Sequence, residues 1–537
     1  MLRYKYFLIL FLFFTSVMGQ GYNYKFRVLL EDKGNTGFSI DNPIQFLSQE
    51  AIDRRARQGI AIDETDLPVS ADYISEVELL GCIVVAKSKW LNSLTVHCAD
   101  SSLIENIKAL DFVKDAVFVW KGTGITARVK TSKSLKRITA ETDSYYGPAY
   151  KQIAMHKGDL LHSDGYRGEG MKIAVIDAGF ENINENLMLS NAMIQEFKDF
   201  VYQGDNPTDS NHGIKVLSCM ATSQSNTFVG TAPNAKYWLL RSENPASEFP
   251  VEEDYWVAAA EYADSIGVDL INTSLGYSWF DKPAENLVYE QIDGKTTFIT
   301  RGADMAASKG IFVVGSAGNE GAKTWRHITV PGDAASILTV GAIRADSTIT
   351  SFSSRGPTYD SRIKPDVVAL GDQVPLIDQN GNIGTDSGTS MSSPIMCGLA
   401  ACLWQANPGL TSVQLGDVIR RSSNRYSTPD NDYGYGIPDM MLAMEIAQSY
   451  LGIDSNETET KNYFGIVADS TGTIRIQKLE KDGLRYDVRI YSIDGRTLVL
   501  DSFTEQEKAY KVPSGKKNIY IVNVKCKEFA QSRKICL

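Results

Sequence analysis

Residues 384–394 read GTDSGTSMSSP and run directly into the apolar segment IMCGLAACLWQA at 395–406. Gly388 allows the backbone to approach another group closely, and Pro394 suits the first turn of a helix, where no N–H is needed. The segment 395–406 is apolar almost all round, so we expect a buried helix. A serine just before it lies at the positive end of the helix dipole, beside free backbone N–H groups. The stretch therefore predicts that Ser390 is a nucleophile in a reaction whose intermediate carries a negatively charged oxygen.

A serine nucleophile needs a general base and a carboxylate that orients this base. The chain has five histidines: His97, His156, His162, His212 and His327. His212 follows Asn211, a helix-capping residue type, although a lone histidine is more often structural. Asp177 closes the apolar run KIAVID, although an aspartate there is commonly a turn or cap residue. The chain order Asp177, His212, Ser390 is that of subtilisin.

Seven motifs of the central region resemble those of the subtilases, the subtilisin-like serine peptidases, and they follow one another in the family's order. Four carry the catalytic residues: IAVIDAGF at 173–180, HGIKVLSCMA at 212–221, VVGSAGNEG at 313–321 and GTSMSSP at 388–394. The other three are GTAPNAK at 230–236, INTSLG at 271–276 and SFSSRGP…IKPDVVALG within 351–371. Each motif alone is weak evidence, but the ordered set is specific.

The resemblance implies a role for each matching residue. Ser390 attacks the scissile carbonyl, His212 moves the proton, and Asp177 holds the histidine. Asn319 donates its side-chain amide to the oxyanion, together with the backbone N–H of Ser390. The implied substrate-binding residues are Ser274, Leu275 and Gly276 on an edge segment, and Ser316, Ala317 and Gly318 on the opposite wall of the specificity pocket. Protein or peptide substrates are expected, the mechanism needs no metal, and the family often carries structural calcium.

The chain departs from the family pattern next to its catalytic residues. Ala178 replaces a hydroxyl residue after the aspartate, Ile214 replaces threonine, and Ser392 and Ser393 replace two alanines. No catalytic atom is lost, so we expect an active secreted endopeptidase. The alternatives are a catalytically weakened binding protein of the same fold, or a surface adhesin.

The central region, 146–451, alternates apolar strands with helical segments, which predicts an α/β fold with a parallel sheet covered by helices on both faces. The resemblance makes this fold subtilisin-like.

Two regions precede the central region. Residues 1–19 have a basic start and a short apolar run, typical of a signal peptide. Residues 20–140 alternate short strands and helices and end in a basic linker, which predicts a small α+β domain. Its place in the chain is that of a propeptide that blocks the cleft, the alternative being a permanent accessory domain.

The last region, 456–537, alternates polar and apolar residues with period two and contains the turn signal Asp494-Gly495, which predicts a β-sandwich. It is similar to the C-terminal sorting domains of type IX secretion, through VRIYSIDGRTLVL, VPSGKKNIYIVNVK and a basic end. We therefore expect an exported protein, secreted or on the cell surface, that interacts with the type IX machinery. A generic adhesin module is the other interpretation.

Composition limits the remaining possibilities. The chain has 537 residues, 43% hydrophobic and 22% charged, and a net charge of −11, so binding to nucleic acid is not expected. The seven cysteines fit neither a zinc site nor a dense disulfide framework. The sequence leaves open whether a disulfide joins Cys82 to Cys98, or Cys526 to Cys536.

Overall fold

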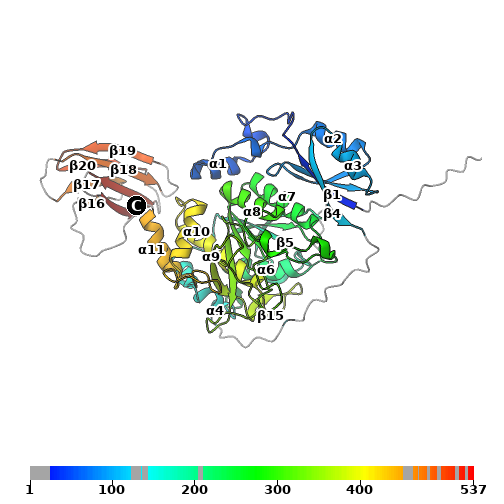
Figure 1. The fold of residues 1–537 in the computed structure, drawn as a ribbon. Helices are drawn as coiled ribbons and strands as arrows, with labels where there is room; N and C mark the ends of the chain where they lie inside the picture. The colour runs from blue at the N-terminus through cyan, green and yellow to red at the C-terminus, as the bar shows by residue number, and fades with distance from the viewer. Residues whose placement is uncertain are drawn as a thin grey trace, which may run out of the picture.

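The computed structural model shows three parts (Figure 1). It describes residues 24–122, 135, 143–202, 210–450, 464–469, 471–479, 484–492, 497–513, 519–526 and 530–536. The predicted signal peptide, 1–19, lies outside this set, as does most of the predicted basic linker. No helix in the described part is long and apolar enough to cross a bilayer.

A seven-stranded sheet with the order β13-β12-β11-β10-β5-β9-β6 forms the centre of the middle part. Each neighbouring pair is parallel. The central strands are almost continuously apolar because both of their faces are buried. The strands are β5 (Lys172–Asp177), β6 (Met193–Asp199), β9 (Lys236–Arg241), β10 (Leu270–Thr273), β11 (Phe312–Ser316), β12 (Leu338–Ile343) and β13 (Val367–Leu370).

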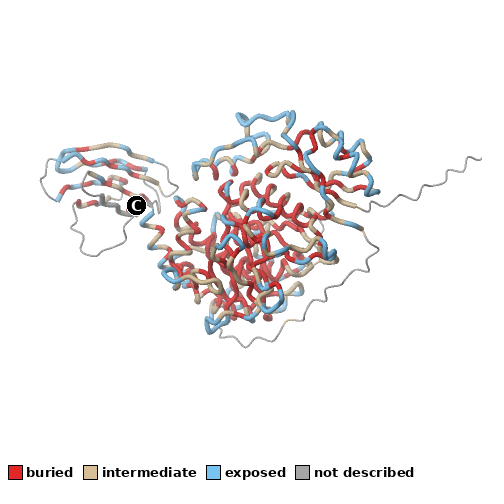
Figure 2. Tube along the Cα trace, viewed as in Figure 1, coloured by how far each residue is buried: buried red, intermediate tan, exposed pale blue. Residues whose placement is uncertain are grey.

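Helices cover both faces of this sheet, as predicted. The core on one face is formed with α7 (Val251–Ser265) and α8 (Phe298–Ser308). The core on the other is formed with α6 (His212–Ala221) and α9 (Thr389–Ala406). Figure 2 shows buried residues throughout this part. Further elements are α4 (Tyr150–Ala154), α5 (Gly158–Ser163), α10 (Ser412–Arg421), α11 (Met440–Tyr450), and the strand pairs β7 (Ser223–Gln224) with β8 (Phe228–Val229) and β14 (Val374–Ile377) with β15 (Ile383–Asp386).

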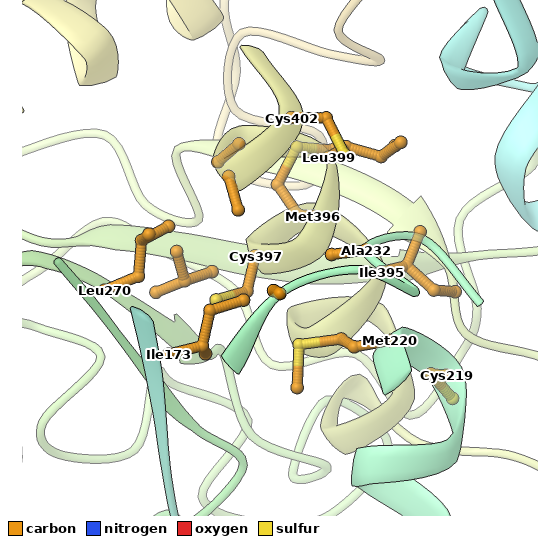
Figure 3. Close-up of a cluster of buried hydrophobic side chains, with 14 of the residues drawn as sticks. Ile173, Cys219, Met220, Ala232, Leu270, Ile395, Met396, Cys397, Leu399 and Cys402 are labelled. Atoms are coloured by element: carbon orange, nitrogen blue, oxygen red, sulfur yellow. The ribbon is translucent and has the colours of Figure 1, made fainter. Parts of the chain in front are cut away.

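The helix α9 is buried as predicted, but it begins at Thr389 instead of residue 395, so Pro394 lies inside the helix. Proline has no N–H, so Pro394 cannot donate to the carbonyl of Ser390, four residues earlier. The Ser274 hydroxyl donates to that carbonyl instead, at 2.8 Å. This bond satisfies the carbonyl that the interior proline leaves without a donor in the helix. Figure 3 shows the buried side chains of α9 beside those of β5, β10 and α6.

The N-terminal part is an antiparallel sheet with the order β2-β3-β1-β4. A disulfide joins Cys82 to Cys98, which is one of the two pairings that the sequence left open. The other involves Cys536, whose side chain is outside the described set. The elements are β1 (Tyr24–Leu30), β2 (Ile83–Ser88), β3 (Ser93–Cys98), β4 (Val113–Lys121), α1 (Gln49–Gln58), α2 (Ala71–Leu79) and α3 (Leu103–Lys108).

Buried charges join the N-terminal part to α7 of the middle part. The Arg27 guanidinium donates to both carboxylate oxygens of Asp254, at 2.8 and 2.6 Å. Arg54 and Arg55 both donate to Asp264, and all three side chains are buried. These contacts place the N-terminal sheet on the outer side of α7 and α8 (Figure 1).

The C-terminal part consists of two antiparallel sheets with the orders β16-β17-β20 and β19-β18-β21-β22. Their inner faces share one apolar core, which is the arrangement of a β-sandwich. The predicted turn Asp494-Gly495 lies outside the described set, between the paired strands β18 and β19. The strands are β16 (Phe464–Ala468), β17 (Thr473–Lys478), β18 (Tyr486–Ser492), β19 (Thr497–Phe503), β20 (Glu507–Lys511), β21 (Ile519–Lys525) and β22 (Ala530–Cys536).

Candidate active site

The three predicted catalytic residues lie at the ends of elements of the parallel sheet and its covering helices. Asp177 is the last residue of β5, His212 is the first residue of α6, and Ser390 is the second residue of α9. Ligands of open α/β sheets bind outside the carboxyl ends of the strands. The fold therefore offers these side chains on the edge where such sites form.

His212 and Asp177 form a hydrogen-bonded pair, with 2.7 Å between Nδ1 and Oδ1. The Asp177 side chain is fully buried, and 33% of the His212 side chain is exposed. Burial alone would lower the pKa of His212, but the Asp177 carboxylate more than offsets this effect and the pKa is raised. The pair has the geometry in which a carboxylate fixes the tautomer of a histidine and leaves Nε2 for another partner.

The loop after Asp177 is held by backbone and side-chain donors. The Ala178 N–H donates to Asp177 Oδ1 at 2.8 Å, whereas Asp177 Oδ2 is buried without a hydrogen bond among the described residues. Arg241 Nε donates to the Ala178 carbonyl at 3.2 Å, and its Nη1 donates to Asp199 at 2.9 Å. Sequence reasoning missed this buried arginine, although an arginine that ends an apolar strand was a visible signal.

The Ser390 hydroxyl points to the neighbouring edge segment. It donates to the carbonyl of Ser274 at 3.0 Å, while the Ser274 hydroxyl donates to the Ser390 carbonyl. No hydrogen bond joins Ser390 to His212 in the part of the chain described. A rotation about the Ser390 Cα–Cβ bond is therefore needed before His212 takes its proton, and such catalytic bonds are often incomplete in the absence of substrate.

Asn319 lies beside the start of α9. Its Oδ1 accepts from the backbone N–H of Thr389 at 2.9 Å and from the Thr389 hydroxyl at 3.1 Å. Its Nδ2 makes no hydrogen bond to another described residue, and Asn319 is exposed. The Thr389 contacts thus fix the amide with its N–H₂ group available, next to the N-terminal backbone N–H groups of α9. This arrangement suits a developing oxyanion.

The two predicted substrate-binding segments follow β10 and end β11, which are neighbours in the sheet. Ser316 Oγ donates to the Leu275 carbonyl at 3.2 Å, and Ala317 is buried behind it. The hydroxyl of buried Thr329 lies against both Gly276 and Gly318, so a Cβ at either glycine would collide with it. Thr329 therefore occupies the space between the ends of the two segments.

A cavity of about 530 Å³ opens beside the edge segment. Its lining includes Gly276, Trp279, Glu248, Glu320 and Lys323. Trp279 comes from the stretch 277–305, and its place in the cavity wall makes this stretch part of the rim of the cavity.

The departures from the family motifs are accommodated by the packing. Ser393 Oγ donates to Asn272 at 2.9 Å, and Ser392 Oγ donates to the carbonyls of Ala369 and Leu370. Ile214 is fully buried in the core. These three residues therefore satisfy their hydrogen bonds or pack with apolar neighbours. Ala178 has no side-chain hydroxyl to donate to the adjacent Asp177 Oδ2, which is buried without a described partner.

The other histidines have different surroundings. Burial lowers the pKa of His156 and of His162 to about 4. His162 also contacts the Tyr146 hydroxyl, and His327 stacks on a tyrosine ring.

Among the described residues, no group of three or more His, Cys, Asp or Glu side chains is arranged to hold a metal ion. The expectation of structural calcium stays a prediction.

Comparison with known proteins agrees with the motif order. The subtilase family matches residues 168–436, and the peptidase S8 propeptide domain of Bacteroidota matches residues 25–136. Subtilisin E of Bacillus subtilis is 29% identical over 297 residues, covering 55% of this chain and 70% of that protein. Serine protease AprX of the same species is 30% identical over 300 residues, covering 50% and 65%. The solved structure of MycP1 from the ESX-1 type VII secretion system aligns with a TM-score of 0.46 at 22% identity, covering 58% and 88%.

The two family matches account for the N-terminal part and for the sheet that carries the site. The seven motifs all lie within the matched residues 168–436, in the part built on a parallel sheet with helices on both faces. The part before it is a propeptide domain of the same peptidase family. The chain belongs to the subtilase family and is a subtilisin-like serine peptidase.

Proposed function

We propose that this peptidase is an exported endopeptidase that hydrolyses peptide bonds through an acyl-enzyme on Ser390. The observation that carries the proposal is the His212–Asp177 pair, 2.7 Å between Nδ1 and Oδ1. His212 removes the proton of the Ser390 hydroxyl as Oγ attacks the scissile carbonyl. It then gives the proton to the leaving amine, and a water molecule hydrolyses the acyl-enzyme by the same route in reverse.

The oxyanion of the tetrahedral intermediate lies between two kinds of donor in this proposal. One is Asn319 Nδ2, whose orientation is fixed through Thr389. The other is the backbone N–H of Ser390 on the first turn of α9, at the positive end of the helix. Each donor is held before the reaction, which is the main source of catalysis in such sites. The Asp177–His212–Ser390 chemistry itself uses no metal.

The substrate is proposed to add as an extended strand along Ser274–Gly276, facing Ser316–Gly318. Extended peptides commonly bind to an exposed sheet edge in this way. The Thr329 side chain lies against both Gly276 and Gly318. This contact supports a preference for small side chains in the pocket between these segments. Assays should therefore begin with peptides that carry alanine before the scissile bond.

The propeptide domain is proposed to inhibit the cleft of its own chain. Its last strand, β4, runs toward the cavity: Trp120 packs edge-on against Phe249, and Lys282 lies over the ring of Phe118. Phe249 follows the cavity-lining residue Glu248, and Lys282 follows Asp281, another lining residue. The chain that leaves β4 therefore starts beside this cavity.

A fluorophosphonate probe tests the catalytic proposal. Processed wild-type enzyme should be labelled at Ser390, because only an activated serine reacts with this class of probe, and Ser390→Ala should not be labelled. Intact mass before and after labelling locates the adduct and identifies the processed ends. A folded, processed wild type that stays unlabelled would contradict the proposal and favour a weakened binding protein of the same fold.

The C-terminal sandwich is proposed to direct the chain to type IX secretion. Support comes from its motif pattern and from its own core, separate from those of the other parts. Deleting residues 456–537 should leave the chain in the periplasm of its host, with the peptidase fold intact, as measured by fractionation and probe labelling. Normal release of the truncated chain would exclude this role. Carbohydrate or protein binding by the secreted full chain, lost in the truncated one, would then identify an adhesin.

A further inference from the structure

Lys215 is an unexpected charge in the helix that carries the catalytic base. It lies one turn after His212 on α6, whose other residues are largely apolar, and only 7% of its side chain is exposed. A lysine is rarely buried without a partner. Its Nζ donates to Asp386 Oδ2 at 2.9 Å. The partner lies 171 residues further along the chain, on the strand that leads to the nucleophile.

Asp386 ends β15 and is followed, four residues later, by Ser390. Its Oδ1 accepts from the backbone N–H of Ser387 at 2.8 Å. The loop is further held by a bond from Gly388 N to the Gly371 carbonyl, at 2.8 Å. One Asp386 carboxylate thus contacts both the helix of the base and the loop of the nucleophile.

Neutral contacts also join α6 and its N-cap to the β14–β15 hairpin. Asn211 Nδ2 donates to Gln379 at 2.9 Å, and the backbone N–H of Ile377 donates to Ser218 at 3.0 Å. The β14–β15 hairpin is therefore attached along α6. Within the described residues, Lys215–Asp386 is the ion pair of this attachment, and of the three polar contacts it lies nearest to Ser390 in the chain.

We propose that Lys215 and Asp386 are positioning residues of the peptidase reaction, whose ion pair sets the place of His212 relative to Ser390. The inference rests on the catalytic function proposed above. Neither side chain needs to touch the reacting atoms. Their pairing instead fixes the distance that the rotated Ser390 hydroxyl must span, and small errors in such a distance cost up to about 100-fold in rate.

The pair also acts on the charge of the base. The groups that act on His212 come from three elements: Asp177 at the end of β5 and Glu243 after β9 raise its pKa, and Lys215 on α6 lowers it. The Asp386 carboxylate compensates the Lys215 charge. Because catalysis needs neutral His212, a lower pKa moves the acidic limb of the activity profile to lower pH, and a higher pKa moves it upward.

Two single variants of the processed enzyme test the proposal through kcat, KM and the pH profile of kcat/KM. Lys215→Met should move the acidic limb upward and Asp386→Asn should move it downward, each by about half a pH unit, the size expected for one charge acting across a partly solvated distance. Both should lower kcat about 10-fold or more and leave KM within about twofold, because no substrate contact is removed. In the double variant the limb should return toward the wild-type position while kcat stays low.

Controls separate positioning from general stability. Lys364→Met breaks another buried pair, with Asp366 at 2.7 Å, and should lower thermal stability without moving the acidic limb. Lys215→Arg keeps the charge and should restore most of kcat. This variant still tests the proposal if Lys215→Met does not fold. Limbs that move in the same direction in the two single variants, or an unchanged kcat in both, would overturn the proposal. Failure of the catalytic proposal itself is distinct, since wild type would then not be labelled by the fluorophosphonate.

Discussion

Replacing His212 with alanine is expected to lower kcat by about 10⁶-fold, the loss that subtilisin itself suffers when its histidine is removed. The reason is that without His212 no base accepts the proton of the Ser390 hydroxyl, which then keeps donating to the Ser274 carbonyl. Binding should change little, because His212 contributes one partly exposed side chain. The measurement is kcat and KM of the processed enzyme on an alanine-containing peptide, with the unfolding midpoint as a check on folding.

The combined effect of two substitutions on kcat makes this prediction more specific. If His212 and Ser390 act as one unit, the double variant His212→Ala/Ser390→Ala should be no slower than either single variant. Asp177→Asn should cost less, about 10⁴-fold, because it disturbs the tautomer of the base and leaves the base present. A loss that multiplies in the double variant would mean that the two side chains act in separate steps, against the proposed mechanism.

The sequence could predict the parallel sheet, which the structure confirms, and it could propose the catalytic residues, because both depend on local patterns. Apolar runs such as KIAVID identify parallel strands, and the order Asp177, His212, Ser390 follows from the motifs. The start of α9 was placed six residues late, because Pro394 was assigned to the first helical turn. Nothing local indicates that the Ser274 hydroxyl, 116 residues earlier, replaces the hydrogen bond that this proline lacks.

The remaining contacts are pairings between distant segments, which no local pattern encodes. Lys215 is visible as a charge in an apolar helix, but its partner Asp386 is not. The same holds for Thr329, whose effect depends on two glycines, Gly276 and Gly318, that follow different strands. A buried charge read from the sequence predicts that a partner exists, and only the fold identifies the partner.

Asp264→Asn is expected to destabilise the unprocessed precursor by about 3–5 kcal/mol, the usual cost of removing one partner of a buried ion pair. Asp264, on α7, is fully buried and receives Arg54 and Arg55 of the propeptide domain, whose side chains are also buried. The neutral amide of the variant would leave two buried guanidinium groups with less counter-charge. Asp66, which also pairs with Arg55 at 2.6 Å, retains part of the compensation for one of them.

The measurement is denaturant unfolding in a Ser390→Ala background, in which the precursor stays uncut. Arg57→Ala is the matched control, since Arg57 is exposed and lies 3.6 Å from Asp269, and it should change stability by about 1 kcal/mol or less. An equal loss for Asp264→Asn and this control would contradict a special role of the buried cluster.

The same substitution should behave differently once the propeptide is gone, and this difference decides what the cluster is for. Burial alone would raise the pKa of Asp264, but Arg54, Lys89 and Arg55 together lower it. Its contribution to precursor stability is therefore complete above the ordinary aspartate pKa of about 3.9 and is lost as pH falls through the lower folded value. All three cations belong to the propeptide domain, so Asp264→Asn in the processed enzyme should cost little. A comparable loss in both forms would show that Asp264 supports the peptidase domain itself, whereas a loss confined to the precursor makes it the anchor that joins the propeptide to the enzyme.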